Sequence, residues 1–258
     1  KKLKRDTSSC QESYGEIAKV LFFMMTPVLL STFLYNVSAY IDQSIFSPLM
    51  LAKGAAADSI TEIYGVFSGQ YMVLINIPVA LANATSTAMM PEITANYATG
   101  DVGGARSKIN EAIRMTMFIA IPAAFGLAVL AYPIMDLLFA GSPDEAGTML
   151  IVGAVSVLFY SLSTITNGVL QGIGKQYIPL RNAAVSLVVN VIVLAGLTKF
   201  TDLGIYSVLA STVAYSLCMC ILNDLAVRKY LSYRGEFVDT YLKPMGAAAG
   251  MGAVAWIV

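Results

Sequence analysis

A long apolar stretch with one polar face runs through residues 63–101. Between residues 66 and 90 it carries no formal charge, and about 20 mostly apolar residues are enough for a helix to cross a bilayer. Polar side chains recur within it at steps of 7, 4 and 7, on one side of a helix with a 3.6-residue period. They are Asn76, Asn83, Thr87 and Thr94. The pattern predicts a membrane helix whose polar face meets other protein or a wet cavity.

Two prolines lie inside the same stretch. Pro78 removes a backbone donor and crowds the preceding turn, so we expect the helix to bend there and to leave one carbonyl without its helical partner. Pro91 repeats this feature further along the chain.

Similar apolar segments occupy most of the chain. Seven of them lie at about residues 17–46, 64–97, 113–139, 148–173, 178–197, 204–227 and 241–258. The connections are mostly under about 15 residues, as in a compact helical bundle. We therefore predict an all-α, polytopic membrane bundle of about seven transmembrane helices, forming one domain over residues 1–258. The chain begins without methionine and stops inside an apolar run, so we expect a longer protein whose last helix is cut short here.

Polar stripes also mark other predicted helices. The first carries Ser31, Tyr35, Ser38 and Asp42 at helical spacing. The fourth carries Ser156, Tyr160, Ser163, Asn167 and Gln171, the fifth Asn182, Ser186 and Asn190, and the sixth Ser207, Ser211 and Tyr215. Each stripe alone is more typical of helix packing, since such contacts contribute about 0.6 kcal/mol on average in membranes. Together they favour a cavity lined by hydroxyls and amides, which suits sugars or water. The candidate cavity residues are Tyr35, Asp42, Asn76, Asn83, Thr87, Asn167 and Gln171.

Asp42 is the deepest acidic residue of these stripes, about one turn from the end of its segment. A charged carboxylate within a membrane helix costs about 2.5 to 3.5 kcal/mol on insertion scales, so such residues are functional candidates. The alternative is that Asp42 reaches the outer water or accepts bonds from a loop.

The composition agrees with a membrane protein and excludes several functions. Hydrophobic residues make up 57% and charged residues 12% of the chain, against about a quarter charged in soluble domains. The formal net charge is zero, which argues against a nucleic-acid partner. Histidine is absent, and with it the commonest metal ligand and general base. We therefore expect no metal site, no cofactor and no enzymatic activity. Cys10, Cys218 and Cys220 are interpreted as incidental thiols.

The basic residues fall on one side of the predicted membrane layout. Assigning alternate sides to the loops places 14 of the 16 Lys and Arg residues with the amino terminus, and only Lys53 and Lys199 opposite. By the positive-inside rule, the amino terminus of the chain is cytoplasmic. This opposes a seven-helix receptor, whose amino terminus lies outside. No acidic metal-binding pair on a large loop supports a membrane-embedded glycosyltransferase.

Several short motifs follow one another in a set order along the chain. They are Pro78, Leu81 and Ala84, then Met90-Pro91-Glu92-Ile93, Gly100-Asp101, Tyr132-Pro133-Ile134, Leu170-Gln171-Gly172-Ile173-Gly174-Lys175, Pro179, Asn182 and Asn190. In this order they resemble the carboxy-terminal half of the polysaccharide-biosynthesis flippases. These belong to the multidrug, oligosaccharidyl-lipid and polysaccharide exporter superfamily and include stage V sporulation protein B-like proteins and lipid II flippases.

The resemblance implies two six-helix bundles around a central cavity, of which this chain would be the carboxy-terminal lobe without its amino-terminal half. It implies alternating access that moves a lipid-linked oligosaccharide or cell-wall precursor across the bacterial cytoplasmic membrane, driven by membrane potential or a coupling ion. The partners would be the lipid-linked glycan and the lipid bilayer. A cation-coupled multidrug exporter is the alternative. No Lys or Arg lies mid-membrane in the predicted helices, although a lipid-linked pyrophosphate needs cationic partners.

Overall fold

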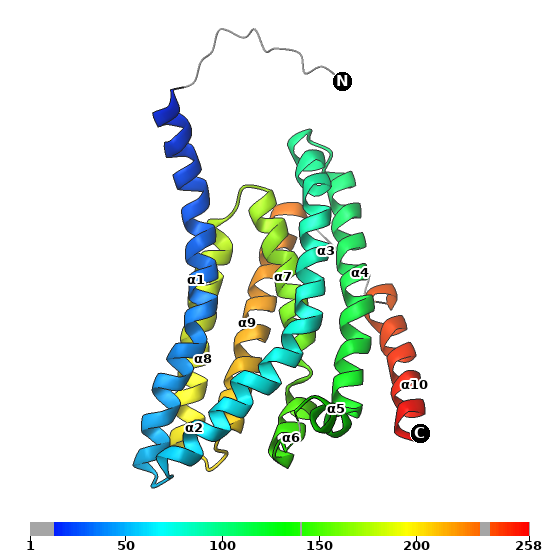
Figure 1. The fold of residues 1–258 in the computed structure, drawn as a ribbon. Helices are drawn as coiled ribbons and strands as arrows, with labels where there is room; N and C mark the ends of the chain where they lie inside the picture. Colours follow the sequence, from blue (N-terminus) through cyan, green and yellow to red (C-terminus); the bar gives the residue numbers. More distant parts are fainter. Residues whose placement is uncertain (1–12, 140, 233–237, 258) are drawn as a thin grey trace.

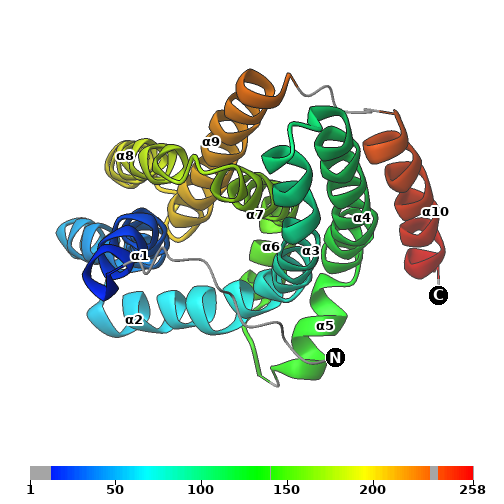
Figure 2. The same ribbon diagram turned by 90° about the horizontal axis from the view of Figure 1, so that it is seen from above.

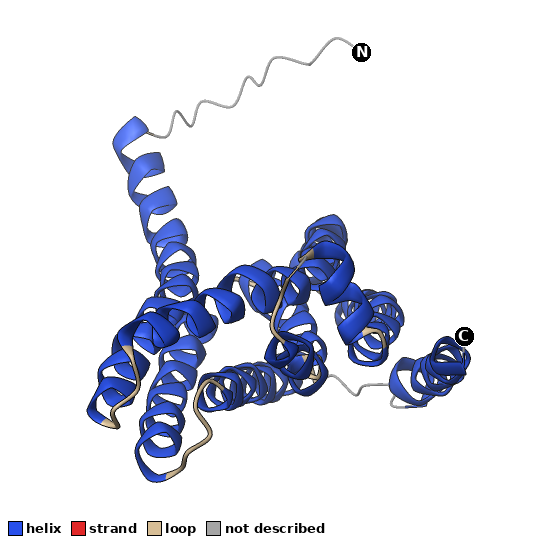
Figure 3. Cartoon of the chain, turned by 60° about the horizontal axis from the view of Figure 1, so that its bottom comes forward, coloured by secondary structure: helices blue, strands red, loops and turns tan. Residues whose placement is uncertain are grey.

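The computed structural model describes residues 13–139, 141–232 and 238–257, and within them every regular element is helical (Figure 1, Figure 3). The elements are α1 (Tyr14–Ala52), α2 (Ala57–Val66), the π-helix η1 (Phe67–Tyr71), α3 (Met72–Ala98), α4 (Val102–Val129), α5 (Ala131–Leu138), α6 (Asp144–Gly153), α7 (Ser156–Gly172), α8 (Tyr177–Phe200), α9 (Tyr206–Leu231), the π-helix η2 (Val238–Leu242) and α10 (Lys243–Ile257). The all-α prediction is confirmed. Cys10, Arg234 and the basic residues before position 6 lie outside the described residues.

Five helices in the described part of the chain are long and apolar enough to cross a membrane. They are α1, the continuous helix Ala57–Ala98, α4, α8 and α9. A sixth span results if α6 and α7, which meet at 48°, are counted together. The chain is therefore a multi-pass membrane bundle. The last predicted segment forms α10, which has 15 residues.

Two predicted spans are divided in the structure. The segment expected at 113–139 ends as α4 at Val129, because Leu130 leaves helical geometry with ψ at 22°. The chain resumes as α5, with Pro133 in its first turn, where proline is tolerated. The segment expected at 148–173 breaks after Gly153, where α6 gives way to α7. The apolar pattern of the sequence does not reveal such breaks, because the side chains on both sides of each break are equally apolar.

The central helix stays helical through both prolines. It runs from Ala57 to Ala98, with the π-helical turn η1 between α2 and α3. Figure 1 shows this helix slanting along α2 and then turning upward along α3. A π-helical turn inserts an extra residue into the helical ladder and is one of the established causes of helix bending, as is proline.

The helices alternate in direction, so connections gather at two ends of the bundle. The start of α1, the α3–α4 turn and the α7–α8 turn lie at the top of Figure 1. Lys53, after α1, forms an ion pair of 3.0 Å with Asp202 at the opposite end. At the α3–α4 turn, Gly100 adopts φ +80° and Asp101 Oδ1 accepts the Gly104 amide at 2.8 Å. Asp101 is therefore the N-cap of α4.

Close packing joins α3 to α7. Gly168 and Gly172, spaced four apart on α7, face Ser86 and Met90 of α3. A Cβ added at Gly168 would lie 2.3 Å from Ser86 Oγ. Small residues at this spacing let membrane helices approach closely. Seen from above in Figure 2, α1, α8, α9, α7 and α3 follow one another in an arc, with α10 beyond α4.

Candidate functional site

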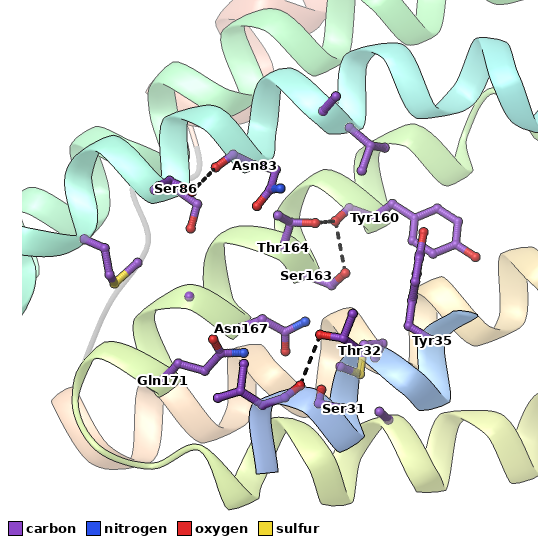
Figure 4. A pocket seen from close by; sticks show the side chains of 18 of the residues that line it. Ser31, Thr32, Tyr35, Asn83, Ser86, Tyr160, Ser163, Thr164, Asn167 and Gln171 are labelled. Atoms are coloured by element: carbon purple, nitrogen blue, oxygen red, sulfur yellow. Dashed lines mark hydrogen bonds between the residues drawn. The ribbon is translucent and has the colours of Figure 1, made fainter. Parts of the chain in front are cut away.

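A cavity of about 800 Å³ lies between α1, α3, α7 and α9. Its lining includes six of the seven predicted cavity residues: Tyr35, Asn76, Asn83, Thr87, Asn167 and Gln171. Figure 4 shows Asn83 projecting into it from α3, and Asn167 and Gln171 from α7. The predicted polar stripes of three helices therefore meet around one space. Thr94, the last residue of the α3 stripe, instead lies against Gly172.

The hydroxyls in this cavity are tied to their own helices. Thr87 Oγ1 donates to the Asn83 carbonyl at 2.9 Å, and Thr164 Oγ1 donates to the Tyr160 carbonyl at 2.8 Å. Bonds of this kind satisfy the hydroxyl proton and leave the oxygen to accept. The side-chain amides of Asn76 and Asn83 make no hydrogen bond to any described residue and are exposed. These two amides are therefore free to bind a polar ligand.

Asp42 lies in a second cavity of about 480 Å³, nearer the opposite end of the bundle. It is 5% exposed, and the Asn190 side chain of α8 interacts with its carboxyl group. Asp42 Oδ1 and Asn190 Oδ1 have no hydrogen-bond partner among the described residues. Tyr64, beside them, donates to the Ala39 carbonyl at 2.8 Å. Asp42 is thus buried against α8.

Three tyrosines stand where the two cavities meet. The ring of Tyr35 on α1 contacts Tyr160 on α7 edge to face, at a centroid distance of 5.8 Å, and Tyr215 on α9 at 6.3 Å. Tyr160 and Tyr215 line both cavities, and Tyr35 lines the larger one. The polar stripe of α1 consequently divides at Tyr35: Ser31 faces the larger cavity, and Ser38 and Asp42 face the smaller.

A chain of amides runs behind the larger cavity. Asn182 Nδ2 donates to Asn223 Oδ1 at 2.9 Å, and Asn223 Nδ2 donates to Asn167 Oδ1 at 2.8 Å. Asn223 was not anticipated, because the α9 stripe followed Ser207, Ser211 and Tyr215. The available signal is the step of seven residues from Ser216 to Asn223, since seven residues return a helix to within about 20° of the same direction.

The charges around the two cavities are few. Among the described residues, Asp42 is the single ionisable carboxylate lining either cavity, and no Lys or Arg lines them. A search of the same residues finds no group of three or more His, Cys, Asp or Glu side chains placed to hold a metal ion. Lys108 on α4 instead pairs with Glu92 of α3 at 2.9 Å and with Glu111 at 3.0 Å, at the end with the amino terminus. The described lining of the larger cavity is therefore uncharged, and Asp42 carries the one formal charge in the described lining of the smaller cavity.

Comparison with known proteins gives several relatives. The chain is 29% identical over 187 residues to the lipid II flippase MurJ of Bacillus subtilis strain 168, covering 70% of this chain and 33% of that protein. The probable lipid II flippase MurJ of Rickettsia prowazekii strain Madrid E is 24% identical over 67% of this chain and 33% of its own. Stage V sporulation protein B of B. subtilis is 22% identical over 82% and 40%. The chain spans about a third of the length of the MurJ relatives it matches.

These relatives confirm the resemblance to the polysaccharide and lipid-precursor flippases and do not favour the multidrug-exporter alternative. No solved structure matches the chain. The family described as lipid II flippase MurJ matches residues 10–258, nearly the whole sequence. With its multi-pass helical bundle and polar cavity, the chain belongs to the lipid II flippase MurJ family.

Proposed function

We propose that this chain is the carboxy-terminal lobe of a transporter that flips a lipid-linked oligosaccharide or cell-wall precursor across the bacterial cytoplasmic membrane. The observation that carries the proposal is the 800 Å³ cavity lined by uncharged amides and hydroxyls, in a member of this family. Such groups exchange hydrogen bonds with sugars without binding them as ions. The glycan headgroup occupies the cavity while its lipid tail remains in the bilayer.

The amino terminus of the chain is proposed to be cytoplasmic. The larger cavity extends along α3 and α7 to Pro91 and Gln171, toward the end of the bundle at which α1 begins (Figure 1), so under this proposal it belongs to the cytoplasmic half of the membrane. The smaller cavity around Asp42 belongs to the outer half. Alternating access then moves the headgroup from one half to the other as the lobe rocks against an amino-terminal bundle of the same protein.

Asp42 is proposed as the site where a coupling cation acts. Its Oδ1 and that of Asn190 are both buried without a described partner, and oxygen atoms of this kind are the ligands that hard cations and protons use. The described residues place no basic side chain beside this carboxylate. Binding of a cation there offsets the cost of holding the negative charge in the membrane.

Flipping by proteoliposomes tests the proposal. The full-length protein that contains this chain is reconstituted with a fluorescent lipid-linked glycan. Translocation is measured by quenching the fluorescence of the glycolipid that is present in the outer leaflet. The double variant Asn76→Ala with Asn83→Ala should lower the rate while protein abundance and thermal stability stay at the wild-type values. Asn36→Ala is the matched control, because the Asn36 amide is exposed on α1 and donates to the Thr32 carbonyl of its own helix. Equal translocation with and without the wild-type protein would contradict the proposal.

A further inference from the structure

The amide chain behind the larger cavity has a fixed direction. Arg181 Nη2 lies 3.3 Å from Asn182 Oδ1 at the cytoplasmic start of α8. An arginine side chain only donates hydrogen bonds, so the oxygen of Asn182 faces Arg181 and its NH2 group faces Asn223. The next two hydrogen bonds run in the same direction: Asn182 donates to Asn223, and Asn223 donates to Asn167. The order of donors and acceptors is set by the guanidinium at one end.

The interior members of this chain have no freedom to turn over. Asn182 is 1% exposed and Asn223 is fully buried. Reversing Asn223 alone would set its NH2 against that of Asn182 and its oxygen against that of Asn167. Two buried hydrogen bonds would be lost, and the buried groups left without partners would disfavour the reversed arrangement.

The chain ends at the cavity. Asn167 uses its oxygen to accept from Asn223, which leaves its NH2 group as the part available to a ligand in the space that it lines. Figure 4 shows this side chain projecting into the pocket below Ser163 and Thr164. Hydrogen bonds in a chain polarise one another, and the low dielectric of a buried site strengthens the effect. The positive charge of Arg181 thus makes the Asn167 NH2 group a stronger donor than an isolated amide.

We propose that this relay, Arg181–Asn182–Asn223–Asn167, forms a subsite for a phosphate oxygen of the transported lipid. The inference rests on the proposed function and names the part of the substrate that is recognised. A phosphate oxygen is an acceptor and carries negative charge, so it matches a polarised donor. The relay also explains how a cavity whose described lining contains no Lys or Arg holds a pyrophosphate. Asn167 touches the substrate, and the other three are positioning residues.

One substitution far from the ligand reverses the relay. In Asn182→Asp, residue 182 has only acceptor oxygens, so Asn223 turns its NH2 group toward it and its own oxygen toward Asn167. The Asn167 amide then turns over and presents its oxygen to the cavity. Asn167→Asp reaches the same result directly: one carboxylate oxygen still accepts from Asn223, and the other replaces the donor. Asn36→Asp is the charge-matched control outside the relay.

Binding to two probes separates the outcomes. The purified full-length protein is titrated with undecaprenyl pyrophosphate, which has no sugar, and with a neutral alkyl disaccharide, which has no phosphate. Both relay variants should weaken pyrophosphate binding at least tenfold and disaccharide binding less than twofold, with Asn36→Asp at the wild-type value. A purely structural role would weaken both probes together.

The remaining results decide against the inference in distinct ways. If both variants bind pyrophosphate with wild-type affinity, the phosphate subsite is overturned. It is also overturned if they lose affinity for both probes equally. Loss of the disaccharide alone assigns the donor to a sugar oxygen and also overturns it. If Asn182→Asp does not fold, Asn167→Asp decides, since its new oxygen faces the open cavity. Failure of the wild-type protein to bind or flip either probe contradicts the proposed function instead.

Discussion

The ring of Tyr35 on α1 meets the ring of Tyr160 on α7 edge to face, with 5.8 Å between their centroids and an angle of 88° between their planes. This is a preferred aromatic geometry, stabilising by about 0.5 to 1.5 kcal/mol beyond the area that it buries. Because Tyr160 and Tyr215 line both cavities, the contact lies on the path between them. The tyrosines therefore form a partition between the two cavities, which a headgroup would have to pass in the proposed transport cycle.

Tyr35→Ala should open this partition. A cysteine placed at Ser38, in a background without the native thiols, reports the change, since Ser38 lines the smaller cavity. Its labelling by a membrane-impermeant reagent from the cytoplasmic side should become faster in the Tyr35→Ala variant. Phe33→Ala is the control, because Phe33 is exposed on the same helix. Unchanged labelling would show that the partition does not depend on Tyr35.

Two tyrosine hydroxyls are buried, and we expect their removal to change the free energy of unfolding in different ways. Tyr71 Oη lies 3.2 Å from the Gly153 carbonyl and 3.2 Å from Ser156 Oγ, at the break between α6 and α7. Tyr71→Phe should lower the free energy of unfolding by about 0.5 to 1.5 kcal/mol, the net contribution of a buried hydrogen bond, because Ser156 Oγ still donates to the Gly153 carbonyl at 2.7 Å. Tyr215 Oη has no partner among the described residues, so Tyr215→Phe should be neutral or stabilising. Thermal unfolding in detergent measures both, and similar losses would contradict the assignment.

The glycines of α7 should resist enlargement. Gly168→Ala places a Cβ 2.3 Å from Ser86 Oγ and 2.7 Å from Met90 Cε, so the Ser86 and Met90 side chains have to shift in the α3–α7 contact. Overpacking of this kind typically costs about 1 to 3 kcal/mol. Gly196→Ala on α8 meets nothing within 4 Å and should stabilise slightly, since alanine is favoured over glycine in helices. The two variants are compared by their melting temperatures, and a Gly168→Ala variant as stable as Gly196→Ala would disprove tight α3–α7 packing.

The Asp42→Asn variant tests whether flipping is coupled to a cation gradient through this carboxylate. The neutral isostere keeps the shape of the side chain and removes the charge that attracts a cation, so flipping should continue without its dependence on an ion gradient. Rates are measured in proteoliposomes with an imposed Na⁺ gradient, an imposed pH gradient, or neither. Asp58→Asn is the control, because Asp58 is an exposed acid at the start of α2. Retained gradient dependence in Asp42→Asn would remove Asp42 from the coupling step.

Much of the fold and of the lining of the larger cavity could be predicted because each depends on a local period. Asn76, Asn83 and Thr87 share a helix face by spacing alone, and in the structure that face borders the larger cavity. The break at Gly153 and the end of α4 at Val129 could not be predicted, since apolar residues continue across both. The relation of Asp42 to Asn190 could not be predicted either, because it depends on how α1 packs against α8. The partition and the amide relay each join three helices, and no pattern within one helix contains that information.

The continuous helix from Ala57 to Ala98 is 42 residues long. At 1.5 Å per residue, it measures about 63 Å, roughly twice the thickness of the hydrocarbon layer. Tyr64 and Ser68, on its lower arm, border the Asp42 cavity, and Asn83 and Thr87, on its upper arm, border the larger one. The helix therefore borders the proposed cation pocket with one arm and the proposed glycan-binding cavity with the other. At this helical rise, each arm is about 30 Å long. A tilt of about 10° then displaces the tip of an arm by about 5 Å, roughly the width of a sugar ring.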